Sequence, residues 1–152
     1  MKKVYIFISI LVITFFKICP VSAQVANVYI SEIMYDSPLQ EDKFNNSADH
    51  NNGEYIKLFN PTNQTVNISG WVIKGTEQAE QFAFPTGTII PAQGILLVAY
   101  TSNSGFNFAL FYHLDNTVKV INQSAIILYN KGEMVSLYDA SANYLFLNFP
   151  GL

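Results

Sequence analysis

The clearest structural signal in this chain is Gly53-Glu54-Tyr55-Ile56-Lys57-Leu58-Phe59-Asn60-Pro61, which a polar bridge (residues 62–69) joins to Gly70-Trp71-Val72-Ile73. Alternate residues of the first segment point to opposite sides of an extended chain, so Ile56 and Leu58 share one face. Pro61 ends the strand because proline cannot donate to a sheet ladder. Gly70 lets the backbone approach closely, and the ring of Trp71 is large enough to fix a sandwich core. The stretch therefore predicts two strands of a β fold.

Similar short apolar segments, separated by Gly, Pro, Asn and Asp, occur on both sides of this stretch. Residues 95–100 are apolar on both faces, which predicts a central strand. The C-terminal part predicts a meander of strands at 119–121, 125–129, 134–138 and 144–149, with a hairpin turn at Asn130-Lys131-Gly132. This pattern is typical of an all-β sandwich. Its expected core is Ile56, Leu58, Trp71, Phe82, Phe84, Leu96, Val98, Ile126, Leu128, Val135 and Leu137.

Two segments leave their local structure less defined. In the first predicted strand, residues 25–35, Val28 and Ile30 share a parity with Glu32, so the apolar face is expected to end at Glu32. Phe108, Phe111 and Tyr112 recur at helical spacing, which favours a short helix or irregular turn within residues 106–114. A strand is equally compatible with that aromatic run.

The N-terminal 23 residues have the features of a cleavable export signal. Lys2 and Lys3 precede an apolar run over residues 4–16, and Val21-Ser22-Ala23 is a small-residue cleavage site. The run is shorter than the ~20 residues of a membrane-spanning helix, although an uncleaved signal anchor is an alternative. We expect a mature domain of residues 24–152, without a stable membrane span, that is secreted, periplasmic or at the cell surface.

Composition excludes several function classes for this mature domain. The one cysteine, Cys19, lies in the predicted signal, so disulfides, cysteine nucleophiles and cysteine-bound zinc are excluded. The chain has no arginine, and five scattered lysines face eleven acidic residues after residue 23. Nucleic-acid binding needs clustered cations on the phosphate backbone, so we do not expect a nucleic-acid partner.

Six ordered sequence blocks resemble the lamin-tail domain family over about residues 28–149. This resemblance implies an immunoglobulin-like sandwich of the exported bacterial type, in which such domains often accompany nuclease, phosphatase or other extracellular modules. The family commonly has a second acidic residue where this chain has Lys57, so a role that needs that carboxylate is not transferred. The blocks are residues 29–33, Gly53–Pro61, Ser69-Gly70-Trp71, residues 84–90 and residues 132–139, with an acidic loop between the first two.

The acidic loop is the one candidate cation site in the sequence. Asp36, Glu41, Asp42 and Asp49 are close together in the chain, and calcium prefers clustered carboxylate and carbonyl oxygens. The residue spacing of a dedicated calcium loop is absent. The alternative is a solvated acidic loop that keeps a sandwich edge from pairing with other chains. No other cofactor is expected.

Catalytic motifs are absent from the sequence. His50 and His113, the two histidines, have no second histidine or cysteine at metal-ligand spacing. There is no Gly-x-Ser-x-Gly elbow or phosphate-binding glycine loop. We therefore expect a protein that is not an enzyme.

The remaining function classes are binding and assembly. We expect an exported binding or scaffolding module that contacts protein or envelope glycan at the cell surface. The abundant aromatic residues would suit sugar stacking, but they also suit a core. The alternatives are self-association through a C-terminal edge strand, with Tyr144, Phe146 and Phe149 as interaction residues, or an accessory domain of a larger extracellular enzyme.

Overall fold

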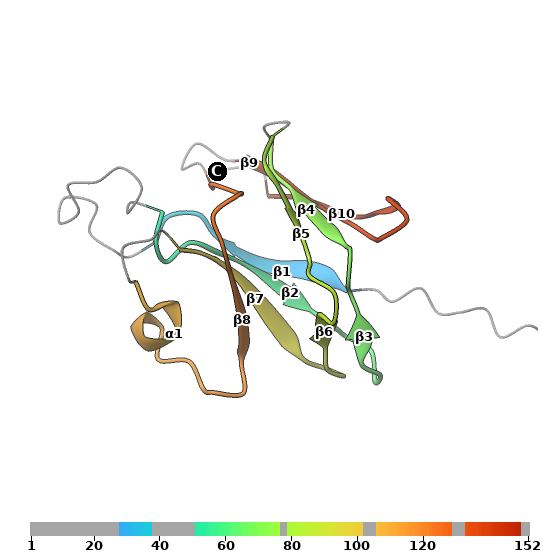
Figure 1. Ribbon diagram of the computed structural model, residues 1–152, viewed down its shortest axis with the longest axis horizontal. Coiled ribbons are helices and arrows are strands. Elements are labelled where there is room, and N and C mark those ends of the chain that lie inside the picture. The colour runs from blue at the N-terminus through green and yellow to red at the C-terminus, as the bar shows by residue number, and fades with distance from the viewer. Residues whose placement is uncertain (1–27, 38–50, 77–78, 102–105, 129–132, 150–152) are drawn as a thin grey trace, which may run out of the picture.

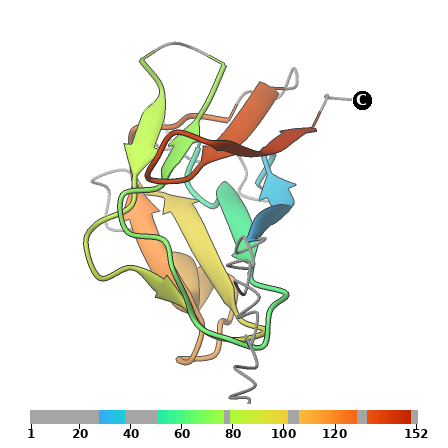
Figure 2. The same ribbon diagram turned by 90° about the vertical axis from the view of Figure 1, so that its right-hand side faces the viewer.

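The structure is a computed structural model that describes residues 28–37, 51–76, 79–101, 106–128 and 133–149. For residues 133 and 146–149 it describes the backbone alone. Two four-stranded sheets pack against each other as a sandwich (Figure 1), and a view turned by 90° shows them as separate layers (Figure 2). The predicted all-β class is confirmed. The predicted signal peptide, residues 1–23, lies outside the described residues.

The first sheet has the strand order β1-β2-β7-β8 and the second the order β10-β9-β4-β5. The strands of the first sheet are β1 (Tyr29–Met34), β2 (Tyr55–Phe59), β7 (Ile95–Tyr100) and β8 (Lys119–Gln123). Those of the second are β4 (Val72–Lys74), β5 (Gln81–Ala83), β9 (Glu133–Tyr138) and β10 (Tyr144–Phe149). A short pair, β3 (Val66–Asn67) and β6 (Ile89–Ile90), accompanies them.

The core between the sheets matches the one expected from the alternation of apolar residues. Ile56 and Leu58 of β2 are buried, and so is Trp71 ahead of β4. Of the expected core residues Phe82 alone is half-buried, and it packs against the same cluster. Gly70 has a φ of +73°, a conformation that glycine adopts without the Cβ penalty, and this turn delivers Trp71 into the core. Both strands that the sequence predicts within residues 53–73 are therefore confirmed, as β2 and β4.

β1 departs from the simple alternation that the sequence suggests. The register with β2 shifts between Ile30 and Glu32, so one extra residue, Ser31, forms a β-bulge. After the bulge Ile33 packs against the core, whereas Glu32 lies opposite Lys57. The expectation that Glu32 shares the face of Val28 and Ile30 is therefore wrong, because a bulge exchanges the two faces of a strand.

The C-terminal meander is also only partly as expected. β8 pairs in parallel with β7, and β9 and β10 form an antiparallel hairpin. The predicted strand at residues 125–129 is not a strand over its described part. Ile126 and Leu128 are nevertheless buried in the core. The side chain of Gln123 explains the local bend, since its Oε1 accepts hydrogen bonds from the backbone N–H groups of Ala125 and Ile126.

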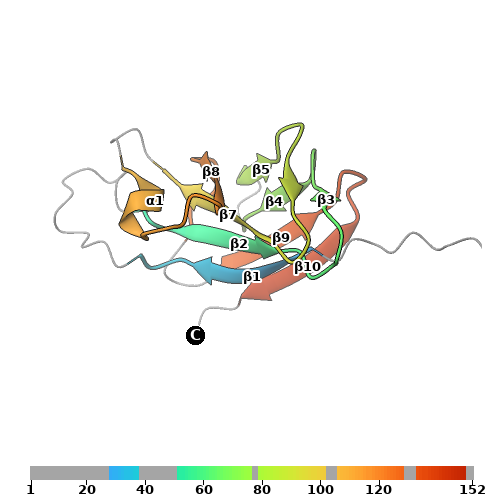
Figure 3. The ribbon, with the colours of Figure 1, turned by 90° about the horizontal axis from the view of Figure 1, so that it is seen from below.

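The outer face of the first sheet is covered in part by a short helix, α1 (Phe108–Phe111). The Asn107 side chain caps it by accepting a hydrogen bond from the Leu110 N–H. Leu97 and Ala99 of β7 form a second small cluster with Phe108 on the face opposite the main core. This explains why β7 is apolar on both faces. The prediction that residues 95–100 form a central strand is confirmed, and the aromatic run within residues 106–114 contains a short helix, not a strand. Figure 3 shows α1 beside β7, away from β10.

Candidate functional site

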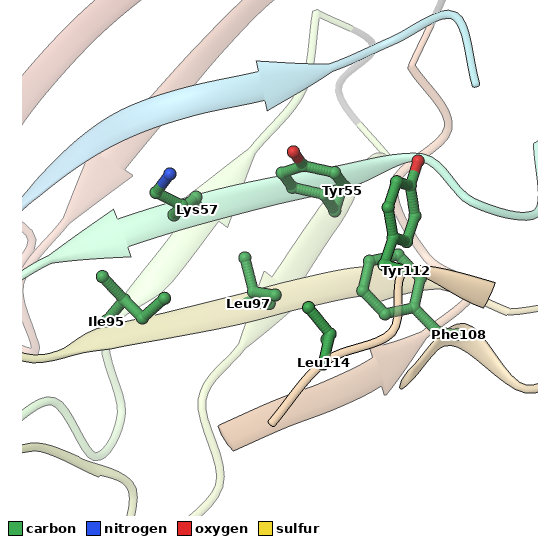
Figure 4. Close-up of a pocket in the computed structure, with 7 residues that line it drawn as sticks. All are labelled: Tyr55, Lys57, Ile95, Leu97, Phe108, Tyr112 and Leu114. Carbon is green, nitrogen blue, oxygen red and sulfur yellow. The ribbon is translucent and has the colours of Figure 1, made fainter. Parts of the chain in front are cut away.

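A hollow opens on the outer face of the first sheet, between β2, β7 and the segment that contains α1. It measures about 140 Å³. Figure 4 shows its lining side chains converging from these three segments. We call this site the outer hollow, and its lining residues are Tyr55, Lys57, Ile95, Leu97, Phe108, Tyr112 and Leu114.

The alternation of side chains along β2 and β7 determines which residues form the floor and rim of the outer hollow. In β2, Ile56 and Leu58 enter the core, so Tyr55 and Lys57 must point outwards. In β7 the same rule sends Leu97 outwards beneath α1. The helix contributes Phe108, and the following turn contributes Tyr112. The site is thus built on the rigid sheet, and its wall comes from a separate element.

The aromatic wall is packed edge to face. The ring of Tyr55 lies 5.7 Å from that of Phe108 and 5.4 Å from that of Tyr112, with both pairs close to perpendicular. The Tyr112 hydroxyl donates a 2.7 Å hydrogen bond to the Gly53 carbonyl, which ties the helix to the start of β2. Burial, together with the charges of Glu32 and Glu54, raises the pKa of Tyr112 to about 12. Tyr112 is therefore a neutral donor at physiological pH.

A polar trio, Glu32, Tyr55 and Lys57, borders the outer hollow. The Tyr55 hydroxyl and the Lys57 ammonium donate hydrogen bonds to the two carboxylate oxygens of Glu32. The hydrogen bonds from Lys57 and Tyr55 lower the pKa of the Glu32 carboxyl, while burial and this bond raise the pKa of the Tyr55 hydroxyl. Glu32 and Lys57 therefore form a balanced ion pair, and the rim has no net charge from this trio.

The outer hollow offers mainly apolar contacts. Its floor and wall are apolar, and the one carboxylate at the rim already accepts from two donors. In the part of the chain that the structure describes, no buried side-chain polar atom lacks a hydrogen-bond partner. An apolar group of a ligand would be buried here, and Glu32 and Lys57 at the rim could contact polar groups next to it.

The predicted calcium ligands are not brought together in the described residues. Asp36 lies exposed just after β1, and Glu41, Asp42 and Asp49 lie outside the described residues. Over the described ranges, no group of three or more His, Cys, Asp or Glu side chains is arranged to hold a metal ion. Calcium binding by this loop stays a prediction. His113 is exposed at the end of the α1 turn, and His50 is outside the description.

The predicted interaction strand does lie at a sheet edge. β10 pairs with β9 alone within its sheet, and Tyr144 is 47% exposed. The Tyr144 ring stacks edge to face on Tyr138 at 5.4 Å. The side chains of Phe146 and Phe149 lie outside the described part of the structure, so their role stays a prediction. The edge is flanked by β1 of the other sheet, which lies beside β10 (Figure 3).

The outer hollow itself is absent from the sequence-based predictions. The alternation that turns Ile56 and Leu58 inwards also turns Tyr55 and Lys57 outwards, but the bulge moves Glu32 to the face opposite to the one that the sequence predicts. The sequence signal that could have found this site is the pair Tyr55 and Lys57 on one strand, together with Glu32 on the preceding strand. The pairing of α1 with that face has no sequence signal of comparable strength.

Comparisons with known proteins give one family. The model of the Lamin Tail Domain matches residues 21–144 of this chain. The match includes both sheets up to the first residue of β10, and it includes every residue that lines the outer hollow. A search of curated proteins returned no match. In the described part of the chain, no helix has the length and apolar character needed to cross a membrane.

Proposed function

Because the chain belongs to the lamin-tail domain family, an immunoglobulin-like fold, we propose that it is an exported, non-catalytic binding module that contacts protein or glycan at the cell surface. The observation that carries this proposal is the outer hollow, an apolar recess on a sheet face outside the core. Packing of the fold does not require such a recess, since the main core is complete without it. Function in this family of folds is carried by such surface sites rather than by the sandwich itself.

The polar trio supports a binding role over a structural one. A partly exposed ion pair contributes little to stability, so Glu32 and Lys57 add little to the pairing of β1 with β2. At the rim of an apolar recess the same two charges would orient a ligand by offering one donor and one acceptor. This combination of an apolar recess with a few placed polar groups is typical of binding sites.

The test is co-sedimentation of the purified protein with envelope preparations of its host. We expect saturable binding that Lys57→Gln weakens by at least tenfold, since a charge-assisted contact contributes about 1.5–3 kcal/mol. Lys119→Gln, the same change on the exposed edge strand β8, is the matched control and should bind as the wild type does. Equal binding by both variants would remove the outer hollow from the proposal. Digestion of the envelope with protease or with glycan hydrolases separates the two partner classes.

A second candidate function, structural self-assembly, is favoured by the edge position of β10. An edge strand presents unpaired N–H and C=O groups that a neighbouring chain can extend. If assembly uses this edge, Phe146→Ala with Phe149→Ala should reduce the concentration-dependent mass of the protein. Unchanged assembly in that double variant would rule the edge out. An accessory role within a larger extracellular enzyme is compatible with either form of contact.

A further inference from the structure

We infer that the partner of the outer hollow is a second copy of this chain, and that Leu110 of each copy inserts into the hollow of the other. This inference rests on the proposed binding function and names its partner. The inference is based on two features of one face of the molecule, the exposed side chain of Leu110 and the apolar outer hollow.

Leu110 is the most exposed large apolar side chain in the described residues, at 70%. It lies on α1, two positions from both Phe108 and Tyr112, whose rings line the outer hollow. At 3.6 residues per turn, two positions correspond to nearly the opposite side of a helix. Because Phe108 and Tyr112 face the sheet, Leu110 points away from it. The hollow opens on the same outer face, so the projection and the recess are directed to the same side of the molecule.

The recess has the size and chemistry of one apolar side chain. Apolar cavities of about 150 Å³ hold a single benzene-sized group, and the outer hollow is close to that volume. Three aliphatic residues, Ile95, Leu97 and Leu114, line it together with aromatic edges. A sugar ring would place several hydroxyl groups against this mostly apolar lining, where they would lose hydrogen bonds to water. A leucine side chain has no polar group that needs a hydrogen-bond partner.

A face that holds both a projection and its recess is self-complementary. Two copies related by a two-fold axis bury each Leu110 in the opposite hollow, which gives two identical contacts from one interaction. The rim does not oppose this approach, since the charges of Glu32 and Lys57 balance. Each contact inserts a single side chain, so we expect an interface smaller than the roughly 1,200–2,000 Å² of stable complexes and therefore a weak dimer.

Sedimentation equilibrium of the exported protein from about 10 µM to 1 mM tests this inference. We expect the wild type to approach the dimer mass, whereas Leu110→Arg, which removes the projection, and Leu114→Arg, which blocks the recess, each weaken association at least tenfold. Met134→Arg, at a residue 51% exposed on the opposite sheet, is the matched control and should associate like the wild type. Circular dichroism melting verifies that each variant is folded.

Mixing the two defective variants gives a result that misfolding cannot imitate. For this mixture Leu110→Glu, which retains an intact recess, is combined with Leu114→Arg, which retains an intact Leu110. The equimolar mixture can form one of the two contacts, and opposite charges meet at the other. We expect the mixture to associate more strongly than either variant alone. A monomeric wild type at 1 mM, or undiminished association of Leu110→Arg, would overturn the inference. Either result leaves the proposed function standing if envelope binding still depends on Lys57, and specific binding of an oligosaccharide would identify a glycan as the partner instead.

Discussion

At the scale of single residues, Glu32 shows how a local backbone irregularity creates a site. The bulge at Ser31 turns the carboxylate from the core face to the outer face, where Lys57 and Tyr55 donate to it. Without the bulge a carboxylate would be directed into the core, and burying it there would be costly. The same irregularity therefore protects the core and completes the rim of the outer hollow.

The lowered pKa of Glu32 predicts a defined dependence of stability on pH. A carboxyl whose pKa is lower in the folded than in the unfolded protein stabilises the fold above its unfolded pKa, here near 4.5. That contribution is lost as the pH falls through the folded pKa. Since the Glu32 side chain is 38% exposed, we expect a contribution below about 1 kcal/mol. Thermal unfolding should show Glu32→Gln less stable than the wild type at pH 6, with a difference that shrinks as the pH falls below 4.5. A difference that is constant over this range would contradict the assignment.

Asn60 is the buried polar residue on which the turn after β2 depends. It is 0% exposed, and its Nδ2 lies within 3.1 Å of the carbonyl oxygens of Gln64, Ile90 and Pro91. Its Oδ1 accepts hydrogen bonds from the N–H and hydroxyl groups of Thr62. The side chain therefore joins this turn to the segment after β6.

We expect Asn60→Ala to lower the free energy of unfolding by about 2–4 kcal/mol, because it leaves several buried groups without partners. Chemical denaturation measures this change. Asn63→Ala, at an exposed asparagine of the same turn, is the control and should stay within about 0.5 kcal/mol of the wild type. A loss of similar size in both variants would show that the hydrogen bonds of Asn60 are not the cause.

At the scale of elements, α1 is the part that turns a plain sheet face into a recess. Its four residues are too few to be stable alone, so its position depends on the Asn107 cap, the packing of Phe108 and the hydrogen bond from Tyr112 to Gly53. We expect Asn107→Ala to destabilise this helix by about 1 kcal/mol. Amide hydrogen exchange of residues 110–114 should then accelerate, while exchange in β2 and β7 remains unchanged.

Asn107→Asp retains an oxygen that can accept from the Leu110 N–H, so it should restore slow exchange. Faster exchange in both variants would mean that the cap is not what holds α1. Because the helix carries Phe108, and Leu110 projects from it, loss of the cap should also weaken contact at the outer hollow.

The elements also show what the sequence could and could not predict. The strands around Ile56, Trp71 and Leu96 follow strict alternation, so their position and core faces were predictable. The bulge at Ser31 was not, because one inserted residue leaves the composition of a strand unchanged. The parallel pairing of β8 with β7 depends on long-range contacts, and the structure of residues 125–128 depends on hydrogen bonds from Gln123. The outer hollow combines the bulge with the placement of α1, so it was beyond local patterns.

At the scale of the whole molecule, the core and the proposed binding site are formed by different faces of the sheets. The sandwich core is formed by inward-facing residues of both sheets, whereas the outer hollow uses outward-facing residues of the first sheet and α1. Substitutions at the hollow rim should therefore change contact without unfolding the domain. β10, at one edge of the second sheet, contributes no residue to the lining of the outer hollow, so the two regions can be varied separately.

Fractionation of the host cell, with intact-mass analysis of the protein and of its Lys57→Gln variant, tests the proposed function most directly. We predict a species that begins at Gln24, held in the envelope fraction as the wild type and released into the medium when Lys57→Gln removes the charged donor at the rim of the outer hollow. A full-length species in the cytoplasm would contradict export. Equal retention of the wild type and the variant would contradict binding through the outer hollow.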